Sequence, residues 1–167
     1  MSTSLPARDA VVLERQFDAS LESVWRMWID PDEFSQWYGP VGASITVLTW
    51  ELSVGGGRLI KMTAQTPRGD MTMWFGGEFV EIAPHERLVY TEFVSDEHGV
   101  AVPGSPDGGT EHASTEVHVT LTESDGQTRM VLTHIGIPAD SPGAVGWTMA
   151  FDKLAARLGA GGERRQQ

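Results

Sequence analysis

The stretch VWRMWIDPDEFSQWYGP, residues 24–40, decides the fold of the first part of the chain. Its three tryptophans, phenylalanine and tyrosine form either an aromatic binding platform or the closure of a small core. The core interpretation is favoured, because burial of one aromatic side chain contributes about 1.5–3 kcal/mol. The spacing i, i+3, i+4, i+7 from residue 21 to 29 also predicts a helix with one buried face. The residues on that face are Leu21, Val24, Trp25 and Trp28.

Asp30 and Pro31 divide this stretch into two helices. Asp accepts hydrogen bonds from the free N–H groups at a helix start, and Pro suits the first helical position. We therefore predict a second, short helix over residues 31–37. Trp37 and Tyr38 lie at its end and are candidates for the rim of a ligand entrance.

The rest of the chain has mainly the character of β-strands. Residues 10–17 are apolar and extended in pattern, and six further runs follow, most of them separated by short turn sequences. Successive strands with short links form an antiparallel sheet. The link at residues 95–112 is longer and rich in Gly and Pro, so it is either a mobile lid or a tolerated insertion. The six runs cover 44–52, 57–65, 71–82, 87–95, 113–123 and 127–135.

The last predicted element is a long helix that follows PADSPGA and ends near Leu158. Its apolar residues recur at intervals of four, three and four residues, which gives one continuous stripe. The sheet is the surface on which this stripe can lie, so we predict an α+β fold with a curved antiparallel sheet around the helix. Residues 10–158 would form one domain, with 1–9 and 159–167 as disordered tails. The stripe consists of Trp147, Phe151, Leu154 and Leu158.

The composition excludes several classes of partner. Twelve basic against twenty-three acidic residues give a net charge of -11, which repels nucleic acid and anionic membranes. The chain has no cysteine, and its five histidines lack metal-ligand spacing, so we predict neither a metal nor a cofactor. Neither a secretory signal nor a run of about 18 apolar residues is present, which predicts a cytoplasmic protein without membrane insertion.

Several segments jointly resemble the START-like, or SRPBCC, superfamily, and within it the homologues of the activator of heat-shock-protein ATPase. The segments are FDASLESVWRMWIDPDEFSQWYGP, VGGGRLIKM, GGEFVEIAPHERLVYTEF, GQTRMVLTHIGIP and the helix that carries Trp147. The resemblance covers residues 10–158 and implies the helix-grip fold. It also implies a cavity between the sheet and the long helix, which the superfamily uses for lipids, sterols, polyketides and other apolar molecules.

Alternation along the strands selects the side chains that face this cavity. In two strands one face is clearly apolar, and it carries Val117, Val119, Met130, Leu132 and His134. His134 is either a satisfied core residue or one of the few fixed polar groups of a ligand site.

Two other strands leave their inward face undecided, because both parities are apolar. Met73 and Trp74 represent the two choices in one strand, whereas Tyr90 and Glu92 share one face of the next. An unpaired buried carboxylate is costly, so we expect Glu92 to point outward. The predicted cavity residues are Trp37, Tyr38, Met73, Trp74, Tyr90, Val117, Val119, Met130, Leu132, His134, Trp147 and Phe151.

We expect the chain to bind a small apolar or aromatic molecule without covalent catalysis. The resemblance also implies a chaperone-associated role, but the eukaryotic activators place much of that contact in an additional N-terminal domain. Here about nine residues precede the first predicted strand, so we rank this role lower. A cyclase or hydrolase that uses His134, Tyr90 or Glu92 for proton transfer is a third hypothesis. A homodimer through the outer sheet face or the edge strands is also open.

Overall fold

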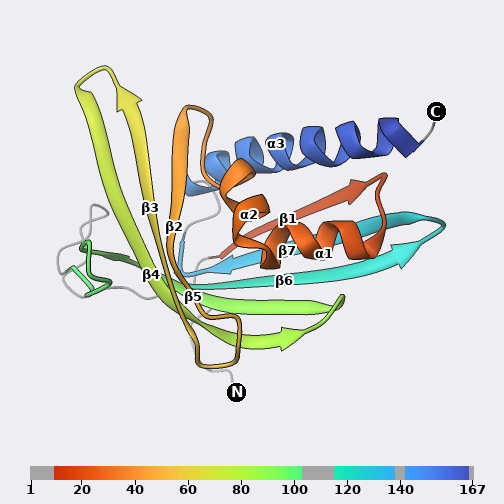
Figure 1. Cartoon of the computed structure of the whole chain (residues 1–167), viewed down its shortest axis with the longest axis horizontal. Helices are drawn as coiled ribbons and strands as arrows, with labels where there is room; N and C mark the ends of the chain where they lie inside the picture. The colour runs from red at the N-terminus through yellow and green to blue at the C-terminus, as the bar shows by residue number, and fades with distance from the viewer. Residues whose placement is uncertain (1–9, 103–114, 138–141, 166–167) are drawn as a thin grey trace.

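The computed structural model describes residues 10–102, 115–137 and 142–165 (Figure 1). Seven antiparallel strands form one curved, unclosed sheet in the order β1-β7-β6-β5-β4-β3-β2, which confirms the predicted helix-grip class. Figure 1 shows the three helices in the angle between the β2–β4 part of the sheet and the remaining strands. The elements are β1 (Ala10–Phe17), α1 (Leu21–Ile29), α2 (Pro31–Trp37), β2 (Ala43–Trp50), β3 (Gly57–Thr66), β4 (Gly69–Ala83), β5 (Arg87–Ser95), β6 (Thr115–Ser124), β7 (Gln127–Ile135) and α3 (Pro142–Arg165).

The last helix is longer than its apolar stripe predicts. It runs from Pro142 to Arg165, so residues 159–165, which we assigned to a tail, continue the helix. Proline suits the first turn. Residues 159–165, GAGGERR, include three glycines, which are poor helix formers, so local propensity does not predict this extension. None of the helices in the described ranges is long and apolar enough to cross a membrane. Most of the 95–112 link and both chain ends lie outside those ranges.

The aromatic stretch at residues 24–40 forms the core, and the platform interpretation is wrong for its helical part. Val24, Trp25 and Trp28 are at most 5% exposed, as the helical spacing predicts. The Trp28 and Trp37 rings pack edge to face with centroids 4.8 Å apart. Trp28 Nε1 also donates to Met130 Sδ at 3.3 Å, which joins α1 to the sheet.

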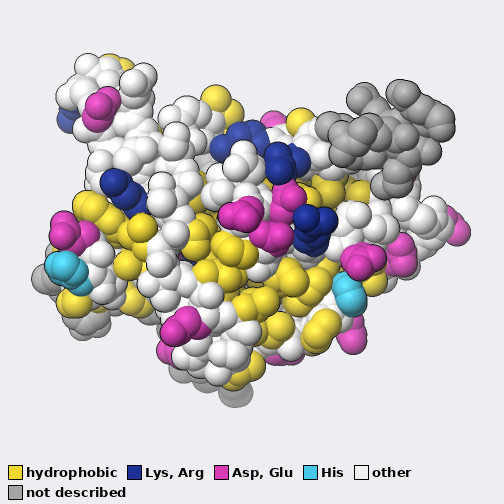
Figure 2. Space-filling view, in the orientation of Figure 1, with side chains coloured by type: hydrophobic (Ala, Val, Ile, Leu, Met, Phe, Trp, Pro, Cys, Tyr) yellow, Lys and Arg dark blue, Asp and Glu magenta, His cyan; other side chains and the backbone are white. Residues whose placement is uncertain are grey.

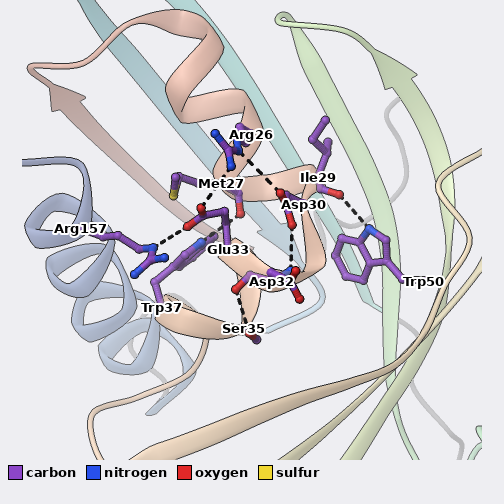
Figure 3. A network of polar contacts seen from close by, with 10 residues as sticks. All are labelled: Arg26, Met27, Ile29, Asp30, Asp32, Glu33, Ser35, Trp37, Trp50 and Arg157. Atoms are coloured by element: carbon purple, nitrogen blue, oxygen red, sulfur yellow. Dashed lines mark hydrogen bonds and ion pairs between the residues drawn. The ribbon is translucent and has the colours of Figure 1, made fainter. Parts of the chain in front are cut away.

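Polar contacts hold α1, α2 and α3 together around this core (Figure 3). Asp30 caps α2, because its Oδ1 accepts a hydrogen bond from the backbone of the second helical residue at 2.9 Å. Trp37 Nε1 donates to Met27 O at 3.0 Å, and Arg157 Nε of α3 donates to Glu33 Oε1 at 2.6 Å. Figure 2 shows acidic and basic side chains side by side over these helices, with hydrophobic side chains around them. Surface polar contacts therefore add to the interior packing that holds α1, α2 and α3 together.

The bend of the sheet has a local cause in β4. A Cβ atom on Gly77 would lie 1.9 Å from Thr91 O, so only glycine allows the two strands to approach this closely. The pairing of β4 with β5 also shifts between Phe79 and Glu81, where an irregularity of the β-bulge type bends the strand. The strands on either side of this bend enclose the interior together with α3.

Candidate ligand-binding cavity

A cavity of about 890 Å³ lies between the sheet and the first half of α3. This volume falls within the range of about 300–1,000 Å³ that is usual for small-molecule sites. Most of its wall is apolar, and three methionines contribute flexible side chains. The lining residues are Tyr38, Gly39, Pro40, Met62, Met73, Phe75, Glu92, His134, Ile137, Val145, Gly146, Trp147, Met149 and Ala150.

The turn after α2 forms one wall of the cavity. Tyr38 is the C-cap of α2, and the following Gly39 has a φ of 85°, a backbone conformation that residues other than glycine rarely adopt. Lys153 of α3 donates to Pro40 O at 3.2 Å and to Tyr38 O at 3.5 Å. Partial burial lowers the pKa of Lys153. These contacts hold the turn against the helix.

The structure decides the inward face of β4 and β5. Met73 and Phe75 line the cavity, whereas Trp74 has the opposite parity and faces away from it. In β5 the inward face carries Tyr90 and Glu92. The expectation that Glu92 points outward is therefore wrong.

Glu92 faces inward because Arg58 of β3 compensates its charge. The Arg58 side chain is fully buried, and its Nη1 lies 3.4 Å from Glu92 Oε2. A buried guanidinium without a counter-charge is strongly unfavourable, so each of the two groups stabilises the other's position. The sequence analysis treated Glu92 as unpaired, because its partner Arg58 lies 34 residues away in the chain.

Aromatic rings surround the Arg58 guanidinium on its other sides. Its central carbon lies 3.8 Å from the Tyr90 ring centroid and 5.6 Å from each of the Phe34 and Trp50 centroids. The negative faces of such rings attract a cation. Arg58 Nε and Nη2 are buried without a hydrogen-bond partner among the described residues. The rings therefore take the place of conventional acceptors there.

Two tyrosine hydroxyls complete the polar group around Glu92. Tyr38 Oη donates to Glu92 Oε2 at 3.0 Å and lies 2.8 Å from Tyr90 Oη. Because the Tyr38 proton is directed to the carboxylate, Tyr90 supplies the proton of the second bond. Burial raises the pKa of both hydroxyls, so both are donors at neutral pH. Tyr38 and Arg58 thus contact one oxygen of Glu92, and Tyr90 donates to the Tyr38 hydroxyl.

His134 lies in the cavity wall with both ring nitrogens engaged. Trp147 Nε1 donates to His134 Nδ1 at 2.9 Å, so Nδ1 carries no proton. The neutral ring then has its proton on Nε2, which donates to Thr115 Oγ1 at 2.8 Å. Thr115 Oγ1 donates in turn to Glu92 O at 2.9 Å. Burial lowers the pKa of His134, which favours this neutral form. His134 of β7 thus connects α3 to Thr115 of β6 and, through Thr115, to β5.

The structure brings together only some of the residues predicted for the lining. Tyr38, Met73, His134 and Trp147 line the cavity, together with Glu92. The others of the predicted set, apart from Trp74, are buried beside it, because aromatic rings of α1, α2 and α3 fill that part of the interior. These core residues are Trp37, Tyr90, Val117, Val119, Met130, Leu132 and Phe151.

Two parts of the site lie outside the predicted set of cavity residues. In β3, Arg58, Ile60 and Met62 share one parity, and this alternation was a usable signal for an inward face. In the first turns of α3, four lining residues are spaced i, i+1, i+4 and i+5. They lie beside the apolar stripe that begins at Trp147 and were not part of it. These are Val145, Gly146, Met149 and Ala150.

The site contains no cluster of metal ligands. Within the described ranges, no group of three or more His, Asp or Glu side chains could hold a metal ion. The chemistry available in the lining is that of one carboxylate, one neutral imidazole and one phenol in an apolar wall.

Comparisons with known proteins agree with this architecture. A solved protein from Chromobacterium violaceum is 26% identical, with a TM-score of 0.72 over 90% of this chain and 97% of that chain. A protein from Arthrobacter aurescens is 25% identical, with a TM-score of 0.76 over 90% and 86%. The AHSA1 protein from Silicibacter pomeroyi, at 22% identity and a TM-score of 0.70 over 90% and 98%, shares the fold.

The family is decided by a match over most of the chain. No curated protein matches the sequence significantly. Residues 18–159, however, match the family described as Activator of Hsp90 ATPase homolog 1-like protein. This range includes α1, α2, the sheet from β2 onward and residues 142–159 of α3. The chain therefore belongs to the AHSA1 family, within the START-like helix-grip proteins.

Proposed function

We propose that the chain binds a small apolar or aromatic molecule in the cavity between the sheet and α3, without covalent catalysis. The observation that carries this proposal is a partly open cavity of about 890 Å³ with a mostly apolar wall. Water gains few hydrogen bonds from such a wall, so an apolar ligand that displaces it is stabilised. The methionines Met62, Met73 and Met149 suit ligands of varied shape.

The hydrogen bonds of His134, Tyr38 and Tyr90 favour a structural role over proton-transfer catalysis for these three residues. A general base needs a free lone pair within reach of the substrate. His134 Nδ1 already accepts from Trp147, and the Tyr38 and Tyr90 protons are engaged in the bonds to each other and to Glu92. We therefore assign these residues a structural role in the cavity wall.

A fluorescence titration tests the proposal with 1,6-diphenylhexatriene, a hydrocarbon probe that emits strongly only in apolar surroundings. We expect saturable binding to the wild-type chain, with energy transfer from Trp147 in the wall. Native mass spectrometry gives the stoichiometry, which should be one probe per chain. Failure of the wild type to take up the probe would overturn the proposal.

A pair of variants in α3 locates the bound probe. A side chain at Gly146 would project into open space, since no atom lies within 4 Å of its Cβ position. Gly146→Leu should therefore occupy part of the cavity without a backbone clash and weaken binding about tenfold or more, because probe and side chain compete for one volume. Thr148→Leu is the matched control, because Thr148 is exposed on another side of α3. Equal binding by both variants and the wild type would place the probe elsewhere.

A further inference from the structure

We infer that the ligand carries a hydrogen-bond donor, a hydroxyl or a protonated amine, which Glu92 accepts, and that the cavity disfavours a carboxylate. This inference rests on the proposed function and specifies the chemical class of the ligand. It concerns Glu92, the one acidic residue in the cavity lining as the structure describes it.

The two oxygens of Glu92 have different surroundings. Oε2 accepts from Tyr38 Oη at 3.0 Å and lies 3.4 Å from Arg58 Nη1. Oε1 receives no hydrogen bond from the described residues, and it is not among their fully buried unpaired atoms. The side chain retains 11% exposure, although it lies in the wall of the cavity. A free acceptor is therefore accessible from the cavity.

The other polar side chains of the lining have used their donors. Tyr38 gives its hydroxyl proton to Glu92, and His134 gives its Nε2 proton to Thr115. A ligand group that donates a hydrogen bond thus finds a partner here, whereas a group that only accepts finds no unused side-chain donor among the described lining residues.

Arg58 does not change this preference, because it lies behind Glu92. Its side chain is fully buried and is not part of the cavity wall. Its free Nε and Nη2 are enclosed, and the guanidinium packs over the Tyr90 ring at 3.8 Å. The guanidinium thus balances the charge of Glu92 from the protein side and leaves the negative oxygen facing the cavity. A ligand carboxylate would meet that oxygen and be repelled.

Displacement of diphenylhexatriene by three molecules with the same dodecyl chain tests the inference on the wild-type protein at pH 7. Dodecylamine and dodecanol carry donors, whereas laurate carries a carboxylate. We expect both donor molecules to displace the probe at about tenfold lower concentration than laurate, the effect of one charge-assisted hydrogen bond. A stronger effect of the amine than of the alcohol would identify charge as the main determinant, and equal effects would identify the hydrogen bond.

The double variant Arg58→Met/Glu92→Gln provides the control. It removes both charges together, so that no unpaired charge is left in the core, and the apolar wall stays unchanged. We expect it to lose most of the preference for dodecylamine over laurate, with each displacement measured relative to the variant's own affinity for the probe.

The outcomes separate this inference from the proposed function. If the probe binds but laurate displaces it as well as or better than the amine and the alcohol do, the donor inference is overturned and apolar binding remains intact. An unchanged preference in the double variant would also overturn it, because Glu92 would then not be the acceptor. A complete lack of probe binding would overturn the proposed function itself.

Discussion

The interior has two regions under one sheet, one filled and one open. Beneath α1 and α2, the Trp28, Phe34 and Trp37 rings occupy the space between helix and strand and are fully buried. Beneath the first half of α3, smaller or flexible side chains such as Gly146 and Met73 leave about 890 Å³ unfilled. The same fold therefore has a packed core at one end and an unfilled volume at the other, and the side chains decide which region is filled.

The largest expected effect is loss of stability in the filled region. Trp28→Ala should lower the free energy of unfolding by about 3–5 kcal/mol, because it removes a buried ring and leaves a void. Met73→Ala, in the wall of the open region, should cost only about 1 kcal/mol, since no new enclosed void forms there. Urea unfolding of both variants measures the difference. Similar losses for the two would contradict the distinction between the regions.

The buried ion pair at the boundary of the two regions should give the next largest effect. Glu92→Gln leaves the Arg58 charge uncompensated and should cost about 3 kcal/mol of unfolding free energy. Arg58→Met/Glu92→Gln should recover much of this loss, because no charge then remains buried. A double-mutant cycle from urea unfolding measures the coupling. Additive effects of the single substitutions would show that the two charges do not stabilise each other.

The connection through His134 predicts a smaller, pH-dependent effect. Burial lowers the pKa of His134, so below about pH 6.5 the unfolded chain binds a proton that the folded chain resists. The contribution of this residue to stability is therefore complete above that pH and decreases as the pH falls through it. His134→Asn should cost about 1–2 kcal/mol at pH 7.5 and less at pH 5.5.

Urea midpoints between pH 5.5 and 7.5 measure this dependence. His98→Asn is the control, because the His98 side chain is 76% exposed. A cost of His134→Asn that is constant over this range would contradict the neutral, engaged state of the imidazole.

The smallest expected effect is a gain in stability in the open region. Gly146→Leu should raise the free energy of unfolding by about 0.5–1 kcal/mol, because glycine disfavours a helix interior and the new side chain meets no neighbour at its Cβ. Thermal unfolding of this variant beside Thr148→Leu gives the comparison. A loss of stability would mean that the space at Gly146 is already filled.

Local patterns in the sequence predict most of the fold. The helical spacing around Trp28 and the Asp30-Pro31 pair predict α1 and α2 with their observed ends. Alternation in β6 and β7 predicts which side chains turn inward, because one face of each strand is apolar and the other is polar. The inward faces of β4 and β5 could not be predicted, since both parities there carry apolar residues.

The candidate site depends on contacts that such patterns do not contain. Periodicity predicts that Val119 and Met130 face the interior, but the reach of the aromatic rings decides whether that interior is filled or open. Glu92 can face inward only because Arg58, from another strand, compensates its charge. Both facts arise from tertiary packing between segments distant in the sequence.

The most direct test of the central claim is a crystal structure of the chain grown with diphenylhexatriene. The account predicts density for one probe between α3 and the sheet, in contact with Tyr38, Met73 and Trp147, and with the aromatic cluster around Trp28 unchanged. Density for the probe only on the outer surface, or a cavity closed by side chains that leave no room for it, would contradict the account.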